Sequence, residues 1–172
     1  MIPQQLATLS TNEVEVLSAQ LLEEIETQNE LAESLLALSR GVLTNDIENL
    51  DAQSGRVGAA VERAENVAKR RQKTLTLLFK RCGLDAKRSR LGELIESAPP
   101  ESQELLRRLH DTLKEVARRV RRTNTRNHVL IRDMSVLNQQ LIFSVLGQSN
   151  QVERPHSEFG RGMDQSILDR RI

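Results

Sequence analysis

Three stretches of the chain repeat apolar residues at steps of three and four, the spacing that places side chains on one side of an α-helix. They lie near residues 10–40, 45–82 and 100–146. The second and third stretches keep this rhythm without interruption, as coiled-coil heptads do. The pattern predicts an all-α fold, specifically an elongated antiparallel three-helix bundle or coiled coil.

Capping residues set the expected ends of the first two helices. Ser10 and Glu13 have the spacing of a capping box, so the first helix is expected to begin there. Gly41 is expected to end it, because glycine readily adopts the left-handed conformation of a helix C-terminus. The second helix is expected to start at Thr44 or Asn45 and to end at Gly83.

The last part of the chain is expected to hold a long helix and a tail. Residues 91–96 fit a short helical turn, and two prolines after Ser97 fit a cap followed by a first helical turn. The third long helix is expected to stop at Gly147. The polar remainder predicts a disordered tail. The chain would then divide into a helical bundle domain of residues 1–147 and a flexible tail of residues 148–172.

Composition agrees with a helical protein of the cytoplasm. Aromatic residues make up only 2% of the chain, so the core must be built from aliphatic stripes. Cys82 is the one cysteine and cannot form an internal disulfide, which fits a reducing compartment. The first residues do not resemble a secretory leader, and no apolar run reaches the roughly 20 residues of a membrane span. We therefore expect a cytoplasmic location without membrane insertion.

The net charge of +1 conceals an uneven distribution of charge. Acidic residues dominate residues 1–54, whereas basic residues dominate residues 69–90 and 107–132. Such asymmetry is found in nucleic-acid binders, and it also arises when an acidic helix packs beside basic ones. We favour the second interpretation, with Arg119 reaching the acidic first helix. The run Arg118–Arg122 is then mainly a solvated face, and few aromatic residues are present for stacking on bases.

Residues for catalysis, cofactors or metals are not evident in the sequence. None of the three histidines has a second ligand at the spacing of a helical zinc site; they are His110, His128 and His156. His110 directly follows Leu109 of the apolar repeat, so we expect it at the flank of that repeat. Cys82 falls on a seam, where a small buried residue is the simplest interpretation. No glycine-rich phosphate loop occurs. We expect a non-enzymatic protein with no catalytic residue, cofactor or metal.

Polar residues interrupt the apolar seams at Gln28, Thr123 and Asn127. A buried polar layer can fix the register of packed helices at some cost in stability. The same layer could instead be a weak point at which the bundle opens for a client. We favour the first interpretation.

The end of the third long helix is apolar on every side and is the best candidate binding surface. A helix of this kind has to be covered on every side. A partner or the tail could cover it, or residues 1–9 could cap it as ordinary core, and both interpretations stay open. The predicted client-binding residues are Leu137, Leu141, Ile142, Phe143, Val145 and Leu146.

Three segments of the chain together resemble the FlgN family of flagellar export chaperones. They are the acidic, leucine-rich Leu21–Glu26, the helix end Arg71–Leu84, and Thr123–Ile131 with its asparagine pair followed by apolar residues. The resemblance covers about Leu17–Gly147. The residues that match the family motif are Asn124, Asn127, Leu130 and Ile131.

The resemblance implies a cytosolic chaperone that binds hook–filament junction proteins, which are flagellar hook-associated proteins, before their export by the flagellar type III apparatus. Clients of the family are recognised by the C-terminal region, here the apolar end Leu137–Leu146. Components of the export apparatus are further candidate partners. Two alternatives stay open: a structural coiled-coil scaffold that self-associates as a homodimer, and a basic helical nucleic-acid binder.

Overall fold

The computed structural model describes residues 8–86 and 88–145, apart from the side chains of Ile47 and Val145. This part of the chain forms four helices and no strand, so the all-α class is confirmed. None of the described helices has the length and apolar content that a membrane span requires. The helices are α1 (Thr11–Thr44), α2 (Ile47–Arg81), α3 (Leu91–Glu96) and α4 (Pro100–Val145).

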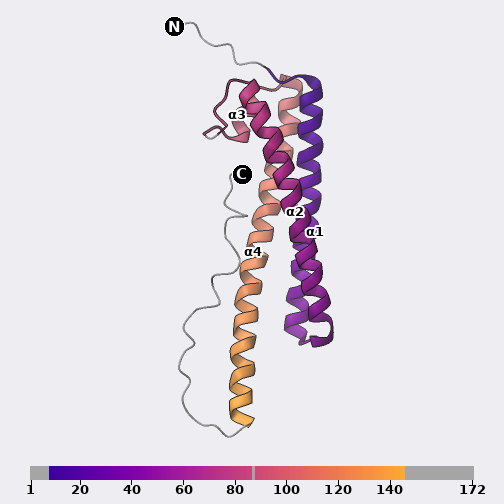
Figure 1. The fold of residues 1–172 in the computed structure, drawn as a ribbon, viewed down its shortest axis with the longest axis vertical. Helices are drawn as coiled ribbons and strands as arrows, with labels where there is room; N and C mark the ends of the chain where they lie inside the picture. Colours follow the sequence, from indigo (N-terminus) through magenta and orange to yellow (C-terminus); the bar gives the residue numbers. More distant parts are fainter. Residues whose placement is uncertain (1–7, 87, 146–172) are drawn as a thin grey trace.

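Three of these helices are long and run side by side (Figure 1). α1 and α2 form an antiparallel hairpin, and α4 runs in the same direction as α1. α1 packs along both other long helices, whereas the backbones of α2 and α4 rarely come close. The short α3 packs on α4 and α2 at the end where α4 begins. α4 extends beyond the turn between α1 and α2.

Aliphatic side chains from all four helices fill the core near α3, as the low aromatic content predicts. Leu17, Leu94 and Leu106 are completely buried there, and Cys82 is buried beside them. Burial raises the pKa of the Cys82 thiol, which keeps it protonated and unreactive. Farther along the bundle, α1 and α2 approach through small residues. This second cluster comprises Leu31, Ala32, Leu35, Ala60, Ala64 and Val120.

The prediction that Gly41 ends the first helix is wrong. α1 continues to Thr44, and Asn45 takes the left-handed conformation at its end, with φ of 51°. Asparagine tolerates this conformation better than most residues, so it can replace glycine as the terminator. Gly41 is buried inside α1, where a Cβ atom would meet the end of the flexible Gln53 side chain of α2.

Other predicted boundaries shift by a few residues or are confirmed. α2 begins at Ile47, two residues later than predicted, and ends at Arg81, just before Gly83 with φ of 72°. The predicted turn at 91–96 is α3. Ser97 is the C-terminal cap of α3 rather than the start of α4, and its hydroxyl donates to the Glu93 carbonyl at 3.3 Å. Residues 148–172 lie outside the described residues, so the division between domain and tail stays a prediction.

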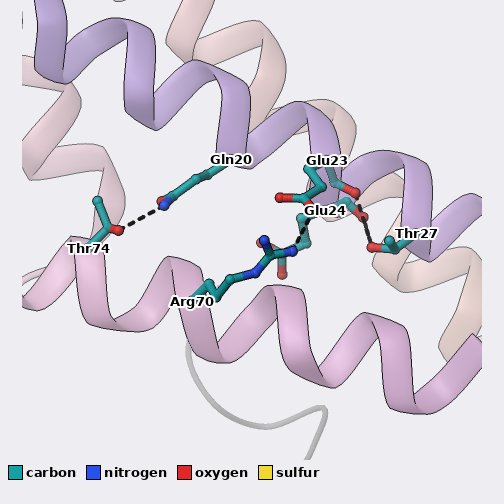
Figure 2. A network of polar contacts seen from close by, with 6 residues as sticks. All are labelled: Gln20, Glu23, Glu24, Thr27, Arg70 and Thr74. Atoms are coloured by element: carbon teal, nitrogen blue, oxygen red, sulfur yellow. Dashed lines mark hydrogen bonds and ion pairs between the residues drawn. The ribbon is translucent and has the colours of Figure 1, made fainter.

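The acidic α1 does pack beside basic residues of α2 and α4. Figure 2 shows Glu23 of α1 facing Arg70 of α2 at 2.5 Å. Glu30 pairs with Arg63 in the same way at 3.1 Å. The predicted reach of Arg119 is confirmed, since its guanidinium lies 2.5 Å from the Glu33 carboxylate. Each exposed pair of this kind contributes about 0–1 kcal/mol to the free energy of unfolding, so these pairs affect the orientation of the helices more than their stability.

One further ion pair between α1 and α2 is buried. Glu24 forms an ion pair with Arg71, and each side chain is only 6% exposed. Burial raises the pKa of Glu24, and the Arg71 guanidinium acts in the opposite direction by favouring the carboxylate. A buried ion pair contributes little net stability, but the loss of one partner leaves an uncompensated charge in the core.

His110 of α4 is also buried, so its predicted place on a flank is wrong. Burial lowers the pKa of His110, and the positive charges of Lys114 and Arg71 lower it further, while Asp111 acts against them. The folded protein therefore favours a neutral imidazole at this position, in a core that already holds the Arg71 cation.

Replacing Arg71 with alanine should lower the free energy of unfolding by about 3–5 kcal/mol, because the Glu24 carboxylate would stay buried without its partner. Urea unfolding followed by circular dichroism measures this value. Arg70→Ala is the matched control on the exposed neighbour and should cost at most about 1 kcal/mol. The double variant E24M/R71M should recover most of the loss. Equal losses of unfolding free energy for Arg71→Ala and Arg70→Ala would show that the buried ion pair matters no more than an exposed one.

Stability should rise with pH up to about 6.5, the ordinary pKa of histidine, because below that value the unfolded chain binds a proton at His110 more readily than the folded chain does. Unfolding free energies of the wild type and of His110→Gln, measured from pH 5 to pH 8, test this. The unfolding free energy of His110→Gln should rise less with pH than that of the wild type. His128→Gln, an exposed position on the same helix, should keep the wild-type rise. Parallel curves for wild type and H110Q would contradict the expectation.

Candidate functional site

One side of α4 changes from buried to exposed along its length. Six residues at intervals of seven share this side, which we call the seam: Leu106, Leu113, Val120, Asn127, Met134 and Leu141. The first four are at most 3% exposed. Met134 is half-buried, and Leu141 is 63% exposed. The apolar repeat thus continues beyond the point at which the described bundle covers it.

The seam becomes exposed because α1 is too short to follow it. The side-chain amide of Asn127 donates to the Leu35 carbonyl of α1 at 2.8 Å, which fixes the relative level of the two parallel helices. α1 continues from Leu35 only to Thr44, which corresponds to Val136 on α4. The rest of α4 therefore projects past α1 by about 13 Å, at roughly 1.5 Å per residue. Figure 1 shows this projection below the α1–α2 turn.

Four of the predicted client-binding residues lie on this projecting end and are exposed. Leu137 and Leu141 belong to the seam side, with Ile142 beside them, and Phe143 lies on the other side of the helix. Val145 is the last residue of α4, but its side chain is not described. Leu146 lies outside the described residues. The structure thus brings the described members together on one uncovered helix end.

Covering by the N-terminal residues was one open interpretation, and Leu9 contradicts it. This residue is buried at the opposite end of the bundle, where its amide donates to the Ser97 carbonyl at 2.9 Å. Residues 1–7 lie outside the described residues. Among the described residues, none covers the seam beyond Met134.

The residues that match the family motif lie where the seam emerges from the bundle. Asn127 is buried, Asn124 and Leu130 are half-buried, and Ile131 is 47% exposed. The three polar interruptions do not form a single layer, because Asn127 is level with Leu35 and therefore lies about two helical turns from Gln28. Asn127 is instead the last residue of α4 that is buried before the exposed end, among the described residues.

The described residues contain no cluster of histidine, cysteine or acidic side chains that could hold a metal ion. Among the buried polar groups that they do contain, Glu24, Arg71 and His110 lie inside the bundle and are not open to a substrate. The exposed apolar end of α4 is therefore the feature of the described chain that most clearly offers a site.

The fold and this site define a class of protein: an all-helical bundle in which one long helix projects with an uncovered apolar face. The model of the FlgN protein family matches residues 13–154, and the chain belongs to that family. FlgN proteins are non-enzymatic chaperones of flagellar export that bind flagellar substrate proteins. No curated protein and no solved structure matches the chain.

Leucines of the buried and exposed parts of the seam should differ sharply in their effect on stability. Leu113→Ala should cost about 2–5 kcal/mol, since it opens a cavity in the core. Leu141→Ala should change the unfolding free energy by less than about 0.5 kcal/mol, because an exposed side chain loses little on truncation. Chemical denaturation of the two variants measures both values. A comparable cost at Leu141 would mean that something covers the seam in the free protein.

Proposed function

We propose that this protein is a cytoplasmic export chaperone that binds hook–filament junction proteins before flagellar type III secretion. Membership of the FlgN family supports the general role. The observation that carries the site is the seam of α4, which runs from a core position at Val120 to a 63% exposed position at Leu141 without a break in its repeat.

The proposed mechanism is completion of the bundle by the client. An amphipathic client helix would dock along Met134, Leu137 and Leu141, in line with α1, which ends at the level of Val136. This is recognition of an apolar helix face, with anchors three, four and seven residues apart. No nucleotide or metal is needed, because burial of apolar surface is the driving force.

The size of the site suits reversible capture. Burial of one large aliphatic side chain contributes about 1.5–3 kcal/mol, and Leu137, Leu141 and Ile142 are each more than half exposed. Association itself costs about 4–15 kcal/mol before any net affinity is gained. Because these three side chains contribute little beyond that cost, we expect weak and reversible binding, which would hold a client helix away from aggregation and still allow its release. Components of the export apparatus are proposed as the partners that receive it.

Self-association is the second candidate function, and the same observation favours it. Two copies of the exposed seam could pair as a coiled coil and give a homodimeric scaffold. The two functions differ in what the seam contacts, so the alternative predicts a dimer that retains no flagellar protein.

Substitution of the exposed seam should abolish client capture without unfolding the chaperone. The tagged full chain should co-purify hook–filament junction proteins from its host, and the variant L137S/L141S should lose about tenfold or more of this yield, as should a truncation after Val136. Quantitative mass spectrometry of the purified material measures the yield.

The matched control is L22S/L77S, which removes two leucines that are 48% and 69% exposed on α1 and α2. This control should retain its clients. Sedimentation of the purified chain runs in parallel. A chain that brings down only itself, as a dimer that L137S/L141S dissociates, would replace the chaperone proposal with the scaffold. Retention of clients by L137S/L141S would refute the proposed site.

A further inference from the structure

The side of α4 that faces away from the bundle carries a second ordered pattern. Residues nine positions apart are separated by about two and a half turns and point in opposite directions. Arg122 is therefore opposite the buried Leu113, and Val129 is opposite the buried Val120. Val136 is likewise opposite the buried Asn127, so the outer side continues along this length of the helix.

Three arginines form the first half of this pattern. Arg118, Arg122 and Arg126 are spaced four residues apart and are exposed. None of their guanidinium groups forms a hydrogen bond or ion pair with the described residues, whereas that of Arg119 beside them is paired with Glu33. Unpaired guanidinium groups in a row present donors that suit carboxylate partners.

Three apolar residues form the second half. Val129, Val136 and Phe143 follow at intervals of seven, and they are 45%, 41% and 45% exposed. A repeat of seven keeps side chains on one side of a helix and is the spacing at which a second helix packs. We call the combined surface the outer strip: Arg118, Arg122, Arg126, Val129, Val136 and Phe143.

We propose that the outer strip binds an amphipathic helix of a partner protein, which carries acidic residues at one end of its contact face and apolar residues spaced by seven at the other. The proposal goes beyond client capture, because the outer strip and the seam lie on opposite sides of α4. A client and this second partner can therefore occupy the helix together, with α4 between them.

Charge and apolar pattern together select this occupant. Nucleic acid would contact Arg118, Arg122 and Arg126 but would leave Val129 and Val136 uncovered, and Phe143 is the one aromatic residue of the strip on which a base could stack. A second copy of this chain is less well matched. Several acidic residues of its α1, Glu23, Glu30 and Glu33 among them, are already engaged by basic residues of the same copy.

The spacing of the outer strip defines a probe. The acidic residues of a matching helix would lie at intervals of four over about 12 Å, and its apolar residues at intervals of seven over about 21 Å. A synthetic peptide of this pattern, with three Glu and three Leu on one side, is made in both chain directions. A matched peptide with Lys in place of Glu is the control, and fluorescence anisotropy with the full chain measures binding.

The Glu peptide, in one of its two directions, should bind about tenfold more tightly than the Lys peptide, and added salt should weaken it. The variants R118A/R122A/R126A and V129S/V136S/F143S should each reduce its affinity by about tenfold. L137S/L141S, on the seam, should leave the affinity within about twofold. Because L137S/L141S is also the variant that tests client capture, the outer strip and the chaperone proposal can fail separately.

Four results would overturn the proposal. The Glu peptides in both directions bind no better than the Lys peptide, or V129S/V136S/F143S leaves the affinity unchanged. A single-stranded oligonucleotide displaces the peptide and binds V129S/V136S/F143S as well as the wild type, which would make the strip a nucleic-acid surface. Sedimentation shows a dimer that both outer-strip variants dissociate, which would make a second copy the occupant.

Discussion

The packing of α4 against α1 sets both the stability of this bundle and the place where its surface becomes available. α1 packs along both other long helices, whereas the backbones of α2 and α4 rarely come close, so most backbone contacts of α4 are made with α1. The contact is apolar down to Val120 and closes with the hydrogen bond from Asn127 to Leu35. Because α1 ends at Thr44 and α4 continues to Val145, a repeat that builds the core at one end has no partner at the other among the described residues.

The long helices could be predicted from sequence because a helical repeat is local information. Spacing within one segment decides it, and α4 is helical as far as Val145, the last described residue. Contacts between segments were harder to predict. Arg71 interrupts an apolar repeat, which is a signal of a buried charge, but its partner Glu24 is 47 residues away and looks like any other acidic residue of α1. His110 was placed on a flank because the lengths of the neighbouring helices, which bury it, cannot be read from its own surroundings.

The sequence predicted only part of the candidate site, because the rest depended on contacts between segments. Composition identified the apolar end of α4, yet whether it would be covered depended on where α1 stops. The prediction ended α1 at Gly41, whereas Asn45 ends it, and the exposed side chains of Leu137 and Leu141 follow from that length and from the register at Asn127. The outer strip could be separated from the seam only after the buried side of α4 was known. Before that, the arginines and the valines looked like one mixed surface.

Amide hydrogen exchange along α4, with and without a hook–filament junction protein from the same host, tests the central claim most directly. In the free chain, amides from Leu137 onward should exchange much faster than those around Leu113 and Val120, since the helix beyond the end of α1 is exposed and opens readily. Addition of the client should slow exchange from Leu137 to Val145 and leave α2 unchanged. Protection that spares this end of α4 and appears on the α1–α2 hairpin would contradict the account.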